Sequence, residues 1–184
     1  VGDSGSGKTS ALASLANAGK KLRILDYDDG LDILSEYLTP EAVSRVSYVT
    51  LRDSLGHANA FRKGAQLLST WKDGEENFGS VKEWGDDTVL VIDSLTLMGE
   101  AALRGALVFN NKKPTEQPTQ PEWGTAARDV QNILQYITGD EVKCNVVVTS
   151  HIQYMEGELG IAKAYPTSVG SKLSTKIGRY FNCV

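Results

Sequence analysis

The feature that most constrains this chain is a glycine-rich loop at residues 2–9, which reads GDSGSGKT and matches the pattern G-x-x-x-x-G-K-[ST]. Its glycines permit backbone angles that turn successive N–H groups inward, toward a chain of phosphates. Apolar residues at helical spacing follow directly, so the positive end of a helix is expected to face the same anion. The loop therefore predicts a nucleoside triphosphate site between a buried strand and a helix.

The residues of this loop have distinct expected roles. Lys8 is expected to reach the β- and γ-phosphates, and the Thr9 hydroxyl is expected to ligate Mg²⁺. ATP and Mg²⁺ are therefore the expected cofactors. The residues expected to bind the nucleotide are Asp3, Ser4, Gly5, Ser6, Gly7, Lys8, Thr9 and Ser10.

The two ends of the chain suggest a longer protein. A phosphate-binding loop normally follows a buried strand, whereas only Val1 precedes it here. We therefore expect a single domain over residues 1–184 that is truncated at both ends, with residues 180–184 forming a strand cut short. A length of 184 residues is enough for one substantial core.

Composition excludes several classes of protein. The hydrophobic content of 41% and the charged content of 23% are ordinary for a globular domain. No apolar run approaches the length of a membrane span, so no membrane partner is expected. The net charge of −4 does not indicate nucleic-acid binding, although residues 159–184 hold four basic residues and no acidic one. The two cysteines lack metal-ligand spacing and are expected to be buried free thiols in a reducing, cytoplasmic compartment.

Strand-like and helical segments alternate along the chain, which favours an α/β fold with a mostly parallel sheet and helices on its faces. The expected helices cover residues 9–18, 40–45, 58–71 and 95–107 and a segment that includes 126–137. The expected strands cover residues 22–26, 46–50, 88–94 and 145–149, and the expected loops cover 72–87, 109–121 and 154–170.

Polar residues at three strand ends are candidates for catalysis. Asp93 ends the most apolar strand, where ligands bind in open α/β sheets, and is expected to complete the Mg²⁺ shell with Thr9. Asp26 and Asp28 lie at the C-terminal end of another strand, and either of them could orient the attacking water. His151 ends a third strand and is expected to sense the γ-phosphate and to couple nucleotide state to the loop that follows.

These residues resemble the RecA-type recombinases. Asp93-Ser94 after an apolar strand resembles their Walker B strand, and the acidic turn at residues 25–30 resembles the turn with their catalytic glutamate, which Asp28 matches in position. Residues 148–151 resemble their sensor strand. The whole chain is most similar to the phage-encoded RecA-like ATPases. This resemblance implies a three-layer α/β/α RecA-like P-loop fold, with the 145–149 strand between the phosphate-binding strand and the Asp93 strand.

The resemblance also implies partners. Single-stranded DNA is expected to contact two mobile loops, at residues 109–123 and 153–170, in phage recombination or annealing in the cytoplasm of a bacterial host cell. A homo-oligomer, either a filament or a ring, is expected to hold ATP between subunits, with a single-strand binding protein as a further partner. Basic residues at 172, 176 and 179 are candidates to reach the neighbour's γ-phosphate. The expected DNA contacts are Lys112, Lys113 and Lys163 with phosphates and Tyr154 and Tyr165 with bases.

Two departures from the family pattern leave other functions open. Aspartate at position 28 is one methylene shorter than glutamate, and the N-terminal segment that joins RecA-type subunits is absent from this sequence. The runner-up function is a RecA-fold ATPase motor or switch that acts on a protein or packages DNA without annealing. A small-molecule kinase is a third reading, although no arginine-rich lid is visible. A non-catalytic nucleotide-binding module is the fourth.

Overall fold

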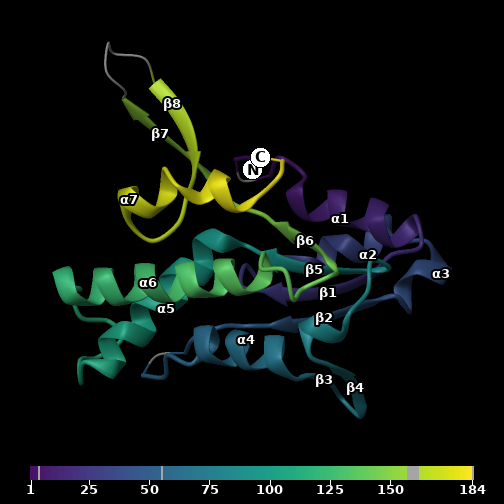
Figure 1. Ribbon diagram of the computed structural model, residues 1–184, viewed down its shortest axis with the longest axis horizontal. Coiled ribbons are helices and arrows are strands. Elements are labelled where there is room, and N and C mark those ends of the chain that lie inside the picture. The colour runs from purple at the N-terminus through teal and green to yellow at the C-terminus, as the bar shows by residue number, and fades with distance from the viewer. Residues whose placement is uncertain (4, 55, 157–161, 184) are drawn as a thin grey trace.

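The computed structural model describes residues 1–3, 5–54, 56–156 and 162–183 (Figure 1). Its centre is a parallel sheet in the order β2-β1-β5-β6, formed by β1 (Lys21–Asp26), β2 (Val46–Thr50), β5 (Thr88–Asp93) and β6 (Asn145–Val148). Every residue of β5 is buried, which agrees with its apolar sequence and with cover on both faces. The four strands predicted from the sequence are all present.

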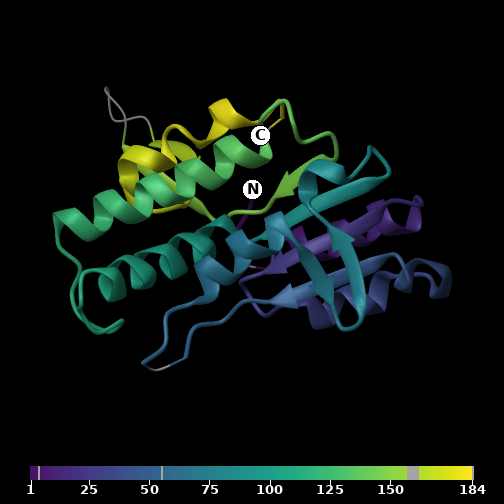
Figure 2. The same ribbon diagram turned by 60° about the horizontal axis from the view of Figure 1, so that its bottom comes forward.

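Alternate residues of the sheet pack into two separate cores. Leu22 and Ile24 of β1 lie with Val91 of β5 against α1 (Lys8–Asn17), α2 (Leu34–Tyr37) and α3 (Pro40–Val43). Leu25 and Ile92 face the other way, toward α4 (Ala60–Ser69), α5 (Leu95–Phe109) and α6 (Gln120–Ile137). The helices α5 and α6 lie side by side (Figure 2). These layers confirm the predicted α/β/α class.

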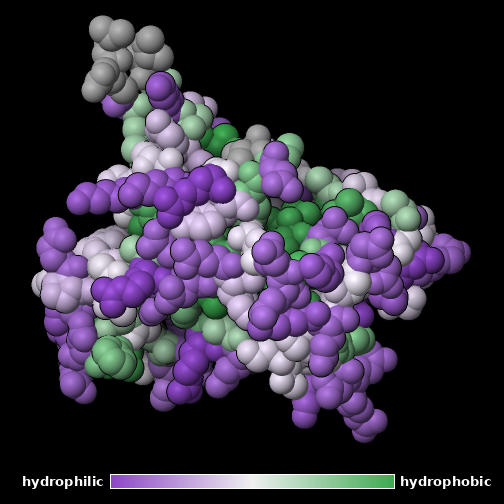
Figure 3. All heavy atoms as spheres, viewed as in Figure 1, coloured by the Kyte–Doolittle hydropathy of each residue, from purple (hydrophilic) through white to green (hydrophobic). Residues whose placement is uncertain are grey.

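The phosphate-binding loop lies beside β6. The Gly2 N–H donates to the Ser150 carbonyl at 3.1 Å, immediately beyond the end of β6. Strand β6 therefore lies between this loop and β5, as the resemblance implied. A hollow of about 580 Å³ lies along β6 and is lined by polar residues such as Asn145 as well as by apolar residues such as Val147 and Phe181. Figure 3 shows hydrophobic surface in this region.

The prediction of a loop at residues 72–87 is wrong for the first half of this segment. It contains an antiparallel hairpin of β3 (Trp71–Asp73) and β4 (Glu76–Gly79), followed by the 3-10 turn η2 (Val81–Glu83). Gly74 takes a φ of 58° in the two-residue connection, a backbone conformation that favours glycine at hairpin turns. The fully buried Trp71 anchors the hairpin on the second core, so packing outweighs the polar composition of the segment.

The C-terminal region also differs from prediction. Instead of a loop at residues 154–170, the chain forms an antiparallel hairpin of β7 (Ile152–Glu156) and β8 (Ala162–Pro166), which projects from the body (Figure 1). Residues 157–161, within the predicted loop, lie outside the described residues. After α7 (Gly170–Ser174), the 3-10 turn η4 (Ile177–Tyr180) replaces the strand predicted at 180–184, and residues 181–183 belong to no strand.

The connection between α5 and α6 is shorter than predicted. Helix α5 continues to Phe109 and α6 begins at Gln120, because Pro121 is accepted in the first turn of a helix. The side chain of Glu122 accepts hydrogen bonds from Asn110, Lys112 and Thr119, so both ends of the connection are fixed to α6. Within the described part of the chain, no helix is both long and apolar enough to cross a membrane.

Candidate functional site

The glycine-rich loop wraps around the N-terminus of α1. Gly5 and Gly7 have φ angles of 74° and 79°, and Gly7 is the N-cap of the helix. A side chain at either position would be strained, which explains the second glycine of the motif, Gly7, and the additional glycine at position 5. Lys8 Nζ donates to the carbonyls of Gly2 at 2.8 Å and Asp3 at 2.7 Å, so its ammonium lies over the loop itself.

The remaining predicted contacts of the loop lie around this turn. The Ser6 N–H donates to the Asp3 carbonyl at 3.2 Å, and Ser10 Oγ donates to the Gly7 carbonyl at 3.0 Å. Ser4 lies outside the described residues.

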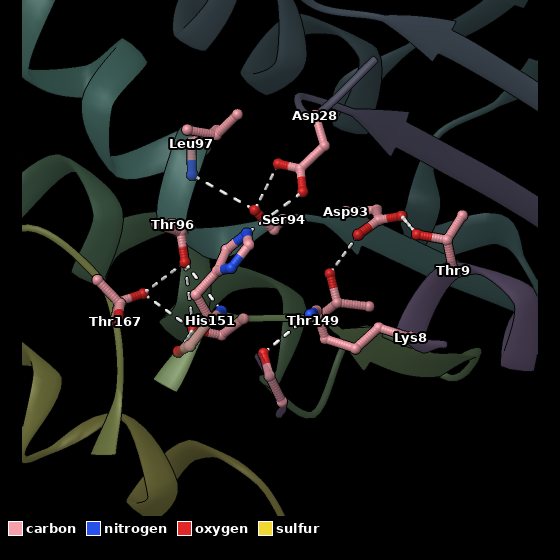
Figure 4. Close-up of polar contacts among 12 residues, drawn as sticks. Lys8, Thr9, Asp28, Asp93, Ser94, Thr96, Leu97, Thr149, His151 and Thr167 are labelled. Carbon is pink, nitrogen blue, oxygen red and sulfur yellow. Dashed lines mark hydrogen bonds and ion pairs between the residues drawn. The ribbon is translucent and has the colours of Figure 1, made fainter. Parts of the chain in front are cut away.

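Thr9 and Asp93 meet at the carboxyl end of β5, as the sequence predicts. Thr9 Oγ1 donates to Asp93 Oδ2 at 2.8 Å, and the Thr149 hydroxyl donates to Asp93 Oδ1 (Figure 4). Asp93 is fully buried, so these two bonds satisfy a carboxylate that would otherwise be costly to bury. Both of its oxygens are thereby fixed in position.

This donor set fits Mg²⁺. The ion prefers oxygen ligands and is commonly held by one or two protein groups together with phosphate oxygens and water. Thr9 and Asp93 supply a hydroxyl and a carboxylate side by side, and the described residues contain no cluster of three or more His, Cys, Asp and Glu side chains that could form an all-protein cage. Thr9 and Asp93 are therefore the residues that would hold Mg²⁺ on the nucleotide.

Asp28 and His151 come together from the segments that follow two different strands, β1 and β6. Asp28 Oδ2 lies 3.7 Å from His151 Nε2, and Asp28 Oδ1 accepts a hydrogen bond from Ser94 Oγ at 2.6 Å. Figure 4 shows these side chains next to the group around Asp93. The sequence predicted Asp28 and His151 at one edge of the sheet, and the structure brings them into direct contact there.

Asp26, the other candidate of the acidic turn, has a different environment. Its carboxylate is buried and accepts bonds from the Asp29 N–H at 2.8 Å and from Thr50 Oγ1 at 3.2 Å. Burial raises the pKa of Asp26 above its ordinary value. Asp26 therefore shapes the turn that carries Asp28, and its oxygens are directed toward the turn and β2.

The predicted DNA contacts are not all alike in the structure. Lys112 Nζ donates to the buried Glu122 at 2.9 Å and to Thr119 Oγ1 at 3.3 Å, so its charge is already paired. Lys113 is exposed. In the β7–β8 hairpin, Tyr165 pairs with Gln153, whereas Tyr154 pairs with Ala164.

The pleat of this hairpin separates the three predicted contacts that it carries. Lys163 and Tyr165 are two residues apart in β8 and share one face, while the exposed Tyr154 lies on the opposite face. One nucleic-acid strand on a single face therefore cannot contact all three side chains.

Three hydroxyls at the site were missed by sequence reasoning. Ser94 holds Asp28, Thr149 holds Asp93, and Thr96 Oγ1 accepts from the His151 N–H at 3.1 Å and donates to the Thr167 carbonyl at 3.2 Å. Thr149 could have been found from strand order, because β5 and β6 pair at Ile92 and Val148 and the next residues on each strand are Asp93 and Thr149. Ser94 and Thr96 lie at the start of α5 and carry no comparable signal.

The glycine loop at the α1 N-terminus, the adjoining Thr9–Asp93 pair and the parallel sheet together define a P-loop NTPase. The comparison with protein families agrees: the family model described as AAA domain matches residues 1–184, and the chain belongs to this family. A search of curated proteins finds no match. The chain is accordingly an AAA-type NTPase domain.

Proposed function

We propose that this protein is an ATPase that acts on single-stranded DNA in phage recombination or annealing, as its resemblance to phage RecA-like ATPases implies. The observation that carries the proposal is the contact between Asp28 and His151, 3.7 Å apart, at the point where the β7–β8 hairpin leaves the core. One partner in this contact is the candidate hydrolytic carboxylate, and the other is the residue directly before β7.

In the proposed reaction, Asp28 orients the water that attacks ATP and accepts its proton. The water oxygen forms a bond to the γ-phosphorus while the bond to the bridging β–γ oxygen breaks, and the proton then passes to the released phosphate. Lys8 binds the β- and γ-phosphates. Mg²⁺, held by Thr9 and Asp93, would neutralise charge on those phosphates.

His151 supports coupling between this site and the hairpin. Its side chain contacts Asp28, while its carbonyl accepts a 2.7 Å bond from the Thr167 N–H, just beyond β8. A movement of His151 on loss of the γ-phosphate would therefore act on both strands at the base of the hairpin. The runner-up function, a motor or switch that acts on a protein, uses the same coupling with a different partner.

The hairpin face that carries Lys163 and Tyr165 is the proposed DNA-binding surface, because it combines a cation for phosphate with an aromatic ring for bases. The exposed Lys113 is the proposed contact in the connection between α5 and α6. In the proposed oligomer, one of three exposed basic side chains after β8 reaches the neighbour's γ-phosphate: Lys172, Lys176 or Arg179.

The test is the ATPase rate with and without single-stranded DNA at low and moderate salt. We expect stimulation that weakens with salt, because phosphate contacts release counterions. Tyr165→Ala should weaken DNA binding by about 1–3 kcal/mol, the usual value of one stacked base. Tyr154→Ala, from the opposite face, is the matched control and should retain binding. If DNA neither binds nor stimulates, the DNA function is excluded and the runner-up is favoured.

The hydrolytic role has a separate test. Asp28→Asn should retain ATP binding, measured by the fluorescence of a labelled nucleotide, and lose turnover. Unchanged turnover would remove Asp28 from the mechanism. If Asp28→Asn loses turnover but the wild type shows no response to DNA, the ATPase function is supported and only the DNA partner is contradicted.

A further inference from the structure

Ser94 is a buried hydroxyl with a defined direction of hydrogen bonding. Its side chain is 0% exposed, directly after Asp93 and at the N-cap of α5. Ser94 Oγ accepts a bond from the Leu97 N–H at 3.4 Å, and it lies 2.6 Å from Asp28 Oδ1 (Figure 4). Because the Leu97 amide can only donate, the hydroxyl hydrogen of Ser94 is left to donate to Asp28.

The backbone of Asp28 is held at the same place. The N–H groups of Tyr27 and Asp28 donate to the Asp93 carbonyl at 2.6 and 3.2 Å, and that carbonyl belongs to the peptide that joins Asp93 to Ser94. Asp28 is thus attached to one short segment through both its main chain and its side chain. With Oδ1 fixed by Ser94, Oδ2 is the oxygen that faces His151.

The position of this carboxylate matters because hydrolysis depends on where the water is held. The Asp28 side chain is 23% exposed, so burial alone does not immobilise it. A displacement of about 1 Å at a reacting group can cost about 100-fold in rate. The hydrogen bond from Ser94 therefore favours one rotamer of the Asp28 side chain over the others.

We propose that Ser94 is a positioning residue that orients the Asp28 carboxylate for ATP hydrolysis. The inference rests on the proposed hydrolytic role of Asp28. Ser94 does not touch the nucleotide in this role and acts only through Asp28. Its loss should therefore affect turnover and leave nucleotide binding unchanged.

The experiment compares steady-state ATP hydrolysis and labelled-nucleotide binding for the full chain and for Ser94→Ala, Ser94→Cys and Asp28→Asn. Ser94→Ala should lower kcat by about 10- to 100-fold, with KM and nucleotide Kd within about twofold of the wild type. Cysteine nearly matches the shape of serine, but its thiol donates weakly. Ser94→Cys should therefore resemble Ser94→Ala in kcat, whereas a purely space-filling role predicts the wild-type rate.

Loss of the N-cap is controlled separately. Ser80→Ala removes a hydroxyl that caps η2 and contacts the Leu68 carbonyl, and it should leave kcat unchanged. Thermal unfolding of each variant identifies any that does not fold, and Ser94→Thr, which restores a hydroxyl, should then recover most of the activity. Wild-type kcat in Ser94→Ala or Ser94→Cys, while Asp28→Asn is inactive, would overturn the role of Ser94 alone. Full activity in Asp28→Asn would instead overturn the proposed hydrolytic mechanism.

Discussion

Two helical glycines provide a direct test of the packing beneath the acidic turn. A Cβ at Gly64, in the interior of α4, would lie 2.1 Å from Tyr27 Oη and 3.1 Å from Leu51 Cδ1. A Cβ at Gly105, in the interior of α5, would meet no atom within 4 Å. Tyr27 is buried and is bonded through the backbone to Asp28, so its ring cannot give way without displacing the turn.

The two glycines allow the energetic terms to be separated. Replacing either glycine with alanine should gain about 1 kcal/mol of helix propensity. Gly105→Ala should keep this gain, whereas Gly64→Ala should also lose about 1–3 kcal/mol to overpacking against Tyr27. Because the propensity term is common to both variants, the difference between their free energies of unfolding measures the overpacking alone.

Urea unfolding followed by circular dichroism gives both values. We expect Gly105→Ala to be more stable than the wild type, and Gly64→Ala to be less stable than Gly105→Ala by about 1–3 kcal/mol. The ATPase rate should fall in Gly64→Ala and remain unchanged in Gly105→Ala, because only the first displaces Tyr27 beside Asp28. Equal stabilities for the two variants would refute the packing of Tyr27 against α4.

Three further predictions concern single side chains. Lys8→Ala should abolish nucleotide binding, measured by equilibrium dialysis, because it removes the principal cation on the phosphates. Thr149→Val should raise the Mg²⁺ concentration needed for half-maximal ATPase activity, because the substitution leaves one oxygen of Asp93 without its hydrogen bond. An unchanged Mg²⁺ requirement would contradict the idea that Thr149 positions Asp93.

The third of these predictions is a pH dependence. Hydrogen bonds from Thr119, Lys112 and Asn110 hold the pKa of Glu122 well below its usual value of about 4.5. The carboxylate therefore stabilises the fold fully above that pH, and the stabilisation is lost as the pH falls below it. Urea unfolding gives the difference in free energy of unfolding between the wild type and Glu122→Gln, and this difference should shrink as the pH falls. A difference that does not change between about pH 3 and 6 would refute the stabilising role of the Glu122 carboxylate.

Strong local patterns in the sequence were enough to predict the core sheet and the meeting of Thr9 with Asp93. The phosphate-binding loop and the uniformly apolar β5 each identify their element without tertiary information, and strand polarity then brings Thr9 and Asp93 to one edge. The two hairpins were missed for another reason. Their sequences are short and polar, and tertiary contacts such as the burial of Trp71 stabilise the first of them.

Local sequence patterns also could not identify the hydrogen-bond partners of the candidate carboxylates. Contact between Asp28 and Ser94 spans 66 positions of the chain and depends on how the acidic turn meets the start of α5. The choice between Asp26 and Asp28 likewise required the direction of each side chain. Register between β5 and β6, by contrast, could have indicated Thr149 once the strand order was assumed.

The anchoring of the connection between α5 and α6 bears on the thermodynamics of any partner that binds there. A disordered loop loses conformational entropy when it is captured, and this opposes association. Here Glu122 already ties Asn110, Lys112 and Thr119 together within the isolated chain. Binding at Lys113 would therefore involve a preorganised segment, with a small entropic penalty and little change in heat capacity from local ordering.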